Sequence, residues 1–544
     1  MKHFNVYISF LIGILIVAVG WWNFSPSDIA KNSPPQKRPN ILFLFADDWG
    51  KYASAYAPYE QSHSINSLIE TPNFDRIASN GALFTNAFVP APSCTPCRSS
   101  ILSGQYFYNT GRGAILHGAE WDKTIPTYPL LLEKYGYHIG FTYKVWSPGN
   151  LLDAPYGGKS KAYEKAGTRF NRFSQIVSEA KDKDIAKKQL YDEVRQNFKS
   201  FLNDNDDNAP FCYWFGPTNT HRPWAKGSGK ELWGLDPDRL QGRLPSFLAD
   251  TPEIREDFND YLGEVLAWDE AVWVIMDVLK KEGELDNTIV VISGDHGVPG
   301  IPRAKTNLYD LGTRVAMAIS WPGHIKKGKV IDQMVNLMDL APTFLEVGGV
   351  EAPSVMNGRS LIPLVTGKME ESTRDFVITG RERHVAQARE GNLPYPQRAY
   401  RTNDYLYIRN LKPNRWPIGT LEDGLRDIDG GPTRDWYIVN YDSIKNMDLW
   451  NISFGKRPKE EFYNVRKDPD HIQNLAYNRA YKELKEIYSD KMDSVLIATK
   501  DPRMVIDPDY FDKMPFINEN EFNIKQHEEN KKRVNEIYNN SRFD

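Results

Sequence analysis

The sequence predicts an α/β fold: a large sheet covered by helices, followed by a smaller C-terminal part that also contains strands. Two uncharged apolar runs, residues 40–46 and 288–293, have the length and composition of buried parallel strands. Residues 257–282 carry apolar side chains near helical spacing. Downstream, residues 376–379 and 401–409 are rich in the β-branched and aromatic residues that strands favour. The length of 544 residues suits one large domain and one smaller one.

The N-terminus resembles a targeting segment. Within residues 1–22, Lys2 and His3 precede the uncharged apolar run 6–19, which is typical of a signal-peptide core or a short membrane anchor. Residues 23–39 are rich in Pro, Ser, Lys and Asn and predict a linker. We therefore expect the rest of the chain to work in the periplasm or as a secreted protein. This segment alone would contact a membrane.

The composition excludes some classes of protein. A net charge of −4 argues against a nucleic-acid partner, and an anionic substrate would need a locally basic pocket. Three cysteines are too few for a disulfide scaffold. The aromatic share of 12% supplies surfaces on which sugars can stack, although most of these side chains will belong to the core.

Polar residues follow both predicted buried strands. Asp47 and Asp48 come directly after the first strand, and Asp295 and His296 follow the second after one glycine. Ligands of open α/β sheets bind beyond the carboxyl ends of the strands, so these side chains are expected at one edge. Three ionised carboxylates would repel one another without a cation, and oxygen ligands favour Ca²⁺ or Mg²⁺. Alternatively, each pair consists of ordinary turn residues.

A cysteine begins a short predicted helix between these strands. Pro96 suits the first turn of that helix and Gly104 suits its end. Cys94 then lies at the helix N-terminus, where free N–H groups favour anions, and Arg98 one turn later could reach the same anion. The alternative is a redox or metal-binding pair of Cys94 with Cys97. No thioredoxin-like pattern surrounds it, and there is no second cysteine pair to complete a zinc site.

The segment Cys94-x-Pro96-x-Arg98 followed by Leu102-Ser103-Gly104 resembles the signature of type I, formylglycine-dependent sulfatases. Further matching stretches occur in the family's order between about residues 40 and 480, which makes the resemblance more specific than the short motif. They include Thr71–Arg76, Pro217–Pro223, Lys305–Tyr309, Trp321–Gly323, Asp339–Thr343 and Glu461–Asn464. The stretch Pro302–Tyr309, with Arg383-His384 and Pro394–Arg398, is most similar to the heparan N-sulfatase (sulfamidase) branch and related polysaccharide sulfatases.

The resemblance implies a fold and a domain organisation. It predicts an alkaline-phosphatase-like large mixed sheet sandwiched by helices in a catalytic domain over residues 40–375. A smaller α+β subdomain is expected over residues 376–514. Residues 515–544 are polar with mixed charge and predict a peripheral helix or a disordered tail.

The resemblance also implies a reaction. A formylglycine-generating maturation enzyme would oxidise Cys94 to an aldehyde, whose hydrate attacks sulfur and then expels sulfate through its second hydroxyl. The resemblance implies Ca²⁺, or Mg²⁺, on Asp47, Asp48, residue 94, Asp295 and His296. Arg98, Lys144 and Lys305 would neutralise sulfate oxygens, and His221 would protonate the leaving oxygen. The expected substrate is a sulfate ester, or a sulfamate, of a sulfated polysaccharide or its oligosaccharides.

One stretch departs from the family's pattern. Lys144 matches, but Tyr143 replaces a glycine, and Trp146 or Ser147 stands where a histidine is expected. His117 is a candidate to fill that place. Two other functions remain open: a phosphatase or phosphonate monoester hydrolase of the same fold, and an exported, metal-stabilised carbohydrate-binding protein without turnover.

Overall fold

The computed structural model describes residues 37–61, 63–149, 155–205, 209–369, 374–515 and 521–540. The predicted targeting segment, residues 1–22, and most of the predicted linker lie outside these residues. None of the helices within these ranges is both long enough and apolar enough to cross a membrane.

A seven-stranded mixed sheet forms the centre of the large α/β part. Its order is β4 (His138–Tyr143), β5 (Phe211–Gly216), β1 (Asn40–Ala46), β6 (Thr288–Gly294), β8 (Met317–Ser320), β2 (Ala82–Phe84) and β9 (Lys329–Ile331). The first four strands are parallel, and β8 runs antiparallel to β6. Both predicted buried strands are confirmed, and they are direct neighbours, with Ile41 opposite Ile289. Their carboxyl ends therefore lie side by side.

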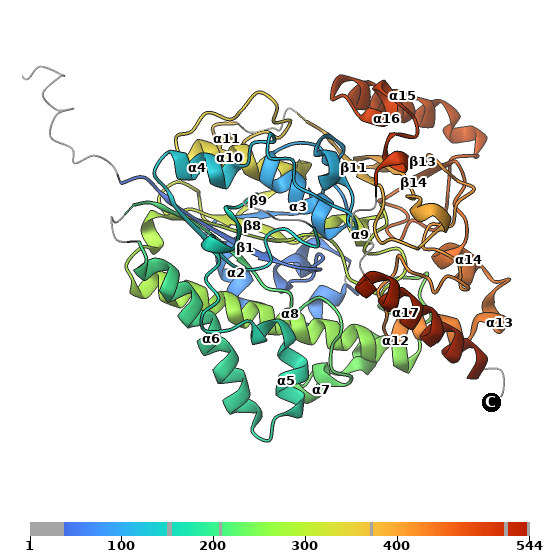
Figure 1. Ribbon diagram of the computed structural model, residues 1–544, viewed down its shortest axis with the longest axis horizontal. Helices are drawn as coiled ribbons and strands as arrows, with labels where there is room; N and C mark the ends of the chain where they lie inside the picture. The colour runs from blue at the N-terminus through green and yellow to red at the C-terminus, as the bar shows by residue number, and fades with distance from the viewer. Residues whose placement is uncertain are drawn as a thin grey trace, which may run out of the picture. The chain divides into compact units, whose positions relative to one another are not determined.

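Helices cover both faces of this sheet (Figure 1). Leu42 and Leu44 of β1 point into a core with α2 (Pro72–Ser79), α6 (Lys183–Asn203) and α8 (Pro252–Lys281). Phe43 and its alternate neighbours point into the opposite core, against α3 (Cys94–Ser103), α4 (Tyr128–Lys134) and α10 (Leu340–Val347). The strand is apolar throughout because neither face meets water. The helix predicted over 257–282 is confirmed but begins at Pro252, where the Thr251 side chain caps it.

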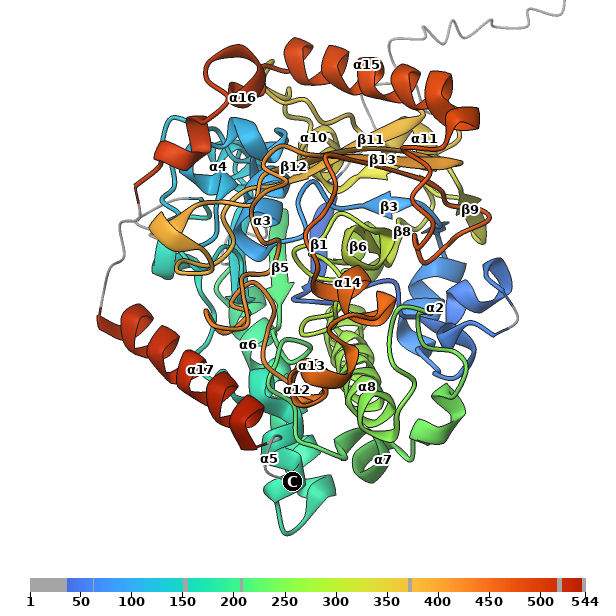
Figure 2. The same ribbon diagram turned by 90° about the vertical axis from the view of Figure 1, so that its right-hand side faces the viewer.

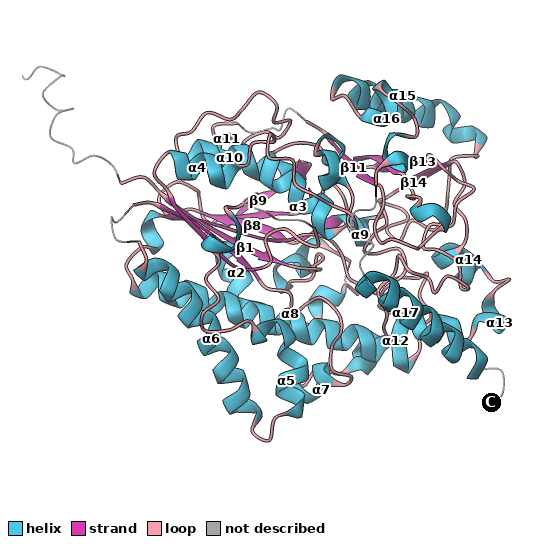
Figure 3. Ribbon diagram, in the orientation of Figure 1, coloured by secondary structure: helices cyan, strands magenta, loops and turns pink. Residues whose placement is uncertain are grey.

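A separate antiparallel sheet follows in the C-terminal part (Figures 2 and 3). It consists of β11 (Phe376–Arg381), β12 (Gln397–Thr402), β13 (Tyr405–Asn410) and β14 (Glu460–Asn464), with α15 (Lys482–Ala498) packed on one face. The strand-rich segment 401–409 is divided by a turn at Asn403 and Asp404, so it contributes to two strands of a hairpin. The predicted fold class, a large helix-covered mixed sheet with a smaller C-terminal α+β part, is confirmed.

The remaining elements are short, apart from the last helix. A three-stranded sheet has the order β10 (Val335–Asn336), β3 (Ala87–Phe88) and β7 (Arg314–Val315). The other helices are α5 (Phe173–Glu179), α7 (Ser228–Trp233), α9 (Asp310–Thr313), α11 (Ile362–Val365), α12 (Pro432–Val439), α13 (Tyr441–Ile444), α14 (Asp448–Phe454), α16 (Pro502–Val505) and α17 (Glu521–Asn540). α17 lies within the predicted tail, residues 515–544, for which a peripheral helix is one of the two predicted alternatives.

The helix predicted after Cys94 is also confirmed. α3 begins at Cys94, with Pro96 in its first turn. It ends at Gly104, whose φ of 66° is the left-handed conformation that glycine adopts without strain. β3 precedes this helix and brings its N-terminus to the carboxyl edge of β1 and β6.

Candidate active site

The four polar residues that are predicted to lie at one edge of the sheet do lie there. Asp47, Asp48, Asp295 and His296 are all buried, with at most 1% of each exposed. The backbone N–H of Asp48 donates to Asp295 Oδ1 at 2.8 Å. His296 Nε2 lies 3.2 Å from Asp48 Oδ1 and 3.6 Å from Asp295 Oδ1. The two strand ends therefore form one polar cluster.

Cys94 enters this cluster from the N-terminus of α3. Its Sγ lies 3.4 Å from His296 Nε2. One potential ligand atom each of Asp48, Cys94 and His296 lie within 4.8 Å of one another, and the same holds for Asp47, Cys94 and Asp295. Burial, followed by the Asp47 carboxylate, raises the pKa of the Cys94 thiol. The environment thus disfavours a thiolate at this position.

The cluster fits a divalent cation. Asp48 Oδ1 is buried and accepts no hydrogen bond from any described residue. Burial raises the pKa of Asp48 to about 7, against the opposing effect of Lys305. A cation at this oxygen would satisfy it and offset the repulsion among the carboxylates. The donor set of carboxylates with one imidazole suits Mg²⁺ or Ca²⁺, although nitrogen is the less typical ligand for Ca²⁺.

The three predicted sulfate-binding cations, Arg98, Lys144 and Lys305, all contact carboxylates of the cluster. Arg98 is fully buried; its Nε donates to Asp295 Oδ2 at 2.9 Å and its Nη2 to Asp47 Oδ1 at 3.0 Å. Its Nη1 donates to the backbone oxygen of Lys144 at 2.8 Å. Lys144 Nζ lies 2.8 Å from both carboxylate oxygens of Asp47. Arg98 therefore joins the ends of β1, β6 and β4.

Lys305 and His221 complete the set of residues singled out from the sequence. Lys305 Nζ lies 3.0 Å from Asp48 Oδ2 and 3.2 Å from Asp429 Oδ2. His221 Nε2 lies 3.8 Å from Asp48 Oδ2, and its Nδ1 is 2.7 Å from the Arg222 carbonyl oxygen, to which it can only donate. Burial and the Lys305 ammonium lower the pKa of His221 to about 4. The structure thus gathers every predicted site residue in one place.

Trp146, one of the two residues at the place where the resemblance leads us to expect a histidine, packs against α3. Trp146 is buried, and its Nε1 donates to Ser99 Oγ of α3 at 2.8 Å. His117, the sequence candidate for that place, contacts the segment after β11: its N–H donates to the His384 carbonyl, and its Nδ1 accepts from the N–H of Ala386. Instead, it is His384 whose side chain reaches the residue before Cys94, with Nδ1 2.8 Å from Ser93 Oγ.

Sequence reasoning missed two residues of this site, His384 and Asp429. Both lie in the C-terminal part of the chain, outside the motifs near Cys94. Asp429 lies two residues after Asp427 and directly before Gly430 and Gly431, a turn-forming pattern that could have drawn attention to it. His384 is part of the Arg383-His384 pair quoted for the branch resemblance, but no site role follows from that pair alone.

The chain matches known proteins over most of its length. Residues 39–350 match the family described as Sulfatase, and residues 302–411 match the family described as N-sulphoglucosamine sulphohydrolase, C-terminal. N-sulphoglucosamine sulphohydrolase of Homo sapiens is 27% identical, covering 85% of this chain and 91% of that protein. An ulvan-active sulfatase of Formosa agariphila is 26% identical, covering 85% and 80%.

Solved structures share the fold. A structure described as a complex with its substrate D-glucosamine-2-N,6-O-disulfate has a TM-score of 0.58 at 20% identity, covering 86% of this chain and 99% of that one. The phosphonate monoester hydrolase of Agrobacterium radiobacter has a TM-score of 0.59 at 18% identity, covering 85% and 96%. At these identities the structures support the fold alone. The family match spans more than half of the chain, and so the chain belongs to the sulfatase family of sulfuric ester hydrolases, in the branch that includes N-sulphoglucosamine sulphohydrolase.

Proposed function

We propose that this protein is an exported sulfatase that removes sulfate from a sulfated polysaccharide or its oligosaccharides, with a formylglycine made from Cys94 and a bound divalent cation, Ca²⁺ or Mg²⁺. One observation carries the proposal. Cys94 is the first residue of α3 and lies among Asp47, Asp48, Asp295 and His296, with its Sγ 3.4 Å from the last of these. That arrangement suits a nucleophile held next to a cation at the anion-binding end of a helix.

The substrate class rests on the relatives. By their names, the curated relatives act on N-sulphoglucosamine and on ulvan, both sulfated carbohydrates. The predicted export segment agrees with an extracellular or periplasmic polymer as substrate. We propose cleavage of O-sulfate esters, with N-sulfate (sulfamate) as the alternative within the same branch.

The side chains around residue 94 have distinct proposed roles. The hydrated formylglycine would supply the nucleophilic hydroxyl and a second hydroxyl that expels sulfate. Asp47, Asp48, Asp295 and His296 would hold the cation, which would stabilise negative charge on oxygen. Arg98 fixes Asp47 and Asp295 relative to each other through its two charged hydrogen bonds. Its burial among these oxygens favours this orienting role over direct contact with sulfate.

Three further residues would act on the substrate itself. Lys144 and Lys305 place ammonium groups on either side of the Asp47-Asp48 pair, where they would attract sulfate oxygens as charge builds up. His221 is the proposed donor of a proton to the leaving oxygen, a role that contributes roughly 10²–10⁴ in rate. Because its pKa without substrate is about 4 and its Nδ1 donates to the Arg222 carbonyl, His221 must first bind a second proton at Nε2, which an anionic sulfate group beside it would favour. Its side chain is 34% exposed, so a substrate can reach it.

The proposal also covers the export, domain organisation and maturation of the protein. We propose that residues 1–22 direct export or anchor the protein, and that residues 23–39 link this segment to the catalytic domain. The catalytic domain would span residues 40–375, the C-terminal subdomain 376–514, and a peripheral tail 515–544. A formylglycine-generating enzyme would act on Cys94 before the segment is enclosed, because Cys94 is only 3% exposed in the folded chain.

Sulfate release from ulvan, heparan sulfate, a sulfated galactan and a fucan tests the substrate class. Turnover of small aryl sulfates alone would contradict the polysaccharide assignment. A phosphatase or phosphonate monoester hydrolase reaction is the alternative within this fold, because sulfate and phosphate groups have similar shapes. The rates on a sulfate and a phosphate ester of one aryl alcohol separate the two. We expect the sulfate ester to be hydrolysed faster.

A further inference from the structure

A cavity lies outside the active site. Its volume is about 770 Å³, within the roughly 300–1,000 Å³ of most ligand pockets, and none of the active-site residues described above lines it. The segment that begins at Lys305 reaches both the active site and the cavity. Lys305 itself points to Asp48, whereas Tyr309 and Asp310 line the cavity. Lys51, shortly after Asp48, also lines it. The cavity is therefore connected to both loops that carry the catalytic cluster.

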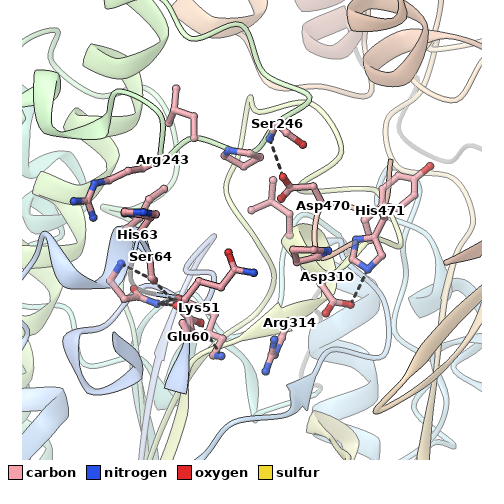
Figure 4. A pocket seen from close by; sticks show the side chains of 18 of the residues that line it. Lys51, Glu60, His63, Ser64, Arg243, Ser246, Asp310, Arg314, Asp470 and His471 are labelled. Carbon is pink, nitrogen blue, oxygen red and sulfur yellow. Dashed lines mark hydrogen bonds and ion pairs between the residues drawn. The ribbon is translucent and has the colours of Figure 1, made fainter. Parts of the chain in front are cut away.

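The walls come from distant parts of the chain. They include the loop after β1, residues 242–247 before α8, β7, and the loop that follows β14 in the C-terminal sheet. The N–H of Ser246 donates to Asp470 Oδ2 at 2.9 Å (Figure 4). This hydrogen bond joins residues 242–247 to the loop that follows β14. The cavity is thus lined by residues in or next to strands of all three sheets.

The charges around the cavity leave two guanidinium groups without a carboxylate. Arg314 donates to the Thr85 carbonyl and to Asn86 Oδ1, both neutral oxygens. Arg243 donates to Ser67 Oγ at 3.1 Å. Among the described residues, neither arginine has a carboxylate oxygen within 4 Å, and the two come from different walls (Figure 4). A planar guanidinium with free donors is well suited to bind sulfate or carboxylate.

The other charged groups of the walls are mostly paired. Glu60 Oε1 lies 2.9 Å from Lys51 Nζ, and Asp310 Oδ2 lies 2.8 Å from Arg401 Nη2. Lys51 remains next to Arg314: burial, and then this like charge, lower the pKa of Lys51 to about 8. An anion between Lys51 and Arg314 would relieve that repulsion.

The cavity also offers a surface for a sugar ring. Tyr59 lines it, and 52% of this residue is exposed, which presents a flat apolar face with a hydroxyl at its end. Tyr52, Tyr309 and Phe247 add aromatic surface deeper in the walls. Aromatic faces combined with arginines are suited to a sugar that carries an acidic group.

We propose that this cavity is a second binding site for the sulfated polysaccharide. It holds an anionic sugar unit through Arg243, Arg314 and Tyr59, while another unit of the same chain binds, or is about to bind, with its sulfate at residue 94. This inference rests on the proposed polysaccharide substrate. The cavity raises affinity for the polymer and takes no part in the cleavage step. A substrate with a single sugar unit gains nothing from it.

The test compares the double variant Tyr59→Ala/Arg243→Ala with a matched control, Tyr477→Ala/Arg479→Ala, at an exposed tyrosine and an exposed arginine away from the cavity. Binding of ulvan and heparan sulfate is measured in the Cys94→Ala background, which cannot turn them over. Turnover of these polymers and of an aryl sulfate is measured with protein in which Cys94 has been converted to formylglycine. We expect a loss of tenfold or more in polymer affinity, a matching rise in KM for the polymer, and unchanged kcat/KM for the aryl sulfate. The control should behave as wild type.

Two results have different meanings. If wild-type protein desulfates a polymer and the double variant binds it equally well, the second site is wrong and the proposed function stands. If wild-type protein neither binds nor desulfates any polymer, the proposed substrate class is wrong and the second site loses its ligand. Arg314→Gln, which keeps a hydrogen-bond donor but removes the charge, should weaken polymer binding in the same way.

Discussion

His384 Nδ1 lies 2.8 Å from Ser93 Oγ, so a side chain from the C-terminal part of the chain contacts the residue that immediately precedes Cys94. The carbonyl of His384 accepts the N–H of His117, which fixes the same segment from the other side. Burial keeps the pKa of His384 well below its ordinary value, so the imidazole is neutral at neutral pH. This contact links the segment after β11 to the N-terminus of α3.

Removal of this contact should slow turnover moderately. We expect His384→Ala to lower kcat/KM about three- to tenfold, the effect of losing one neutral hydrogen bond, and His384→Gln to recover part of the loss. Bound metal should remain unchanged, because His384 does not contact the carboxylate cluster. Steady-state kinetics and metal analysis on the same preparations measure both. Full activity of the alanine variant would show that His384 only fills space.

Loss of a carboxylate at the strand ends should remove the metal. Asp47→Ala and Asp295→Ala each delete a proposed oxygen ligand and leave Arg98 without one of its two ionic partners. We expect no measurable activity and a lower metal content by elemental analysis. Asp269→Asn is the control, since this buried carboxylate accepts from Asn73 and Phe74 away from the cluster. It should keep its metal. A metal-depleted Asp295→Ala protein with full activity would refute the assignment.

The two partners of Lys305 predict unequal effects of mutation. Lys305→Ala removes an ammonium group that faces both Asp48 and Asp429, and it should strongly lower kcat while the fold persists. Asp429→Asn leaves the ammonium attached to Asp48, so we expect a loss of less than tenfold. Kinetics on an aryl sulfate measure both, and circular dichroism checks the fold. An unchanged kcat/KM in Lys305→Ala would exclude this lysine from the site.

Much of this site could be predicted from the sequence because its parts are local. Asp47 and Asp295 each follow a buried strand, so the pairing of β1 with β6 is enough to bring them together. Pro96 and Gly104 mark the two ends of a short helix and so place Cys94 at its start. His384 and Asp429 could not be placed, since their approach depends on how the C-terminal segments pack, hundreds of residues from β1. Sequence alone also could not separate β12 from β13, because a two-residue polar turn lies within a strand-like composition.

A buried carboxylate near the site should make stability depend on acid pH. Asp427 is bound by Arg381 and Arg389, which, against the effect of burial, lower its pKa from 3.8 to about 2. A carboxyl group whose pKa is lower in the folded than in the unfolded chain stabilises the fold at pH values above its unfolded pKa. That stabilisation is lost as the pH falls toward 2. The difference in unfolding free energy between wild type and Asp427→Asn should therefore narrow by about 2 kcal/mol between pH 5 and pH 2.

Urea denaturation at several pH values measures this difference. Asp404→Asn is the control, because Asp404 pairs with Arg466 at the surface, where an ion pair contributes little. Its stability should stay close to that of wild type at each pH. If the difference in unfolding free energy between wild type and Asp427→Asn stayed constant from pH 5 to pH 2, the proposed dependence of stability on pH would be wrong.

The chemistry at position 94 decides the mechanism. A thiol has no second hydroxyl with which to expel sulfate, and burial raises the pKa of this one, so unconverted protein should be nearly inert. Cys97 is buried one turn further along the helix and is expected to remain a thiol. Trypsin cleaves after Arg98, which leaves both residues in one peptide, and fragmentation distinguishes them. We expect an aldehyde at position 94 only, labelled by a hydrazine reagent.

Activity should follow the converted fraction across preparations, because only converted chains would carry the proposed nucleophile. Cys94→Ala should be inactive, whereas Cys97→Ala should be modified and active. Expression with and without a formylglycine-generating enzyme varies the converted fraction without any mutation. A fully active preparation with an unmodified thiol at position 94, or with a disulfide to Cys97, would overturn the formylglycine mechanism. The sulfatase family membership would then stand with a different nucleophile, since it rests on the whole of residues 39–350 and not on this one side chain.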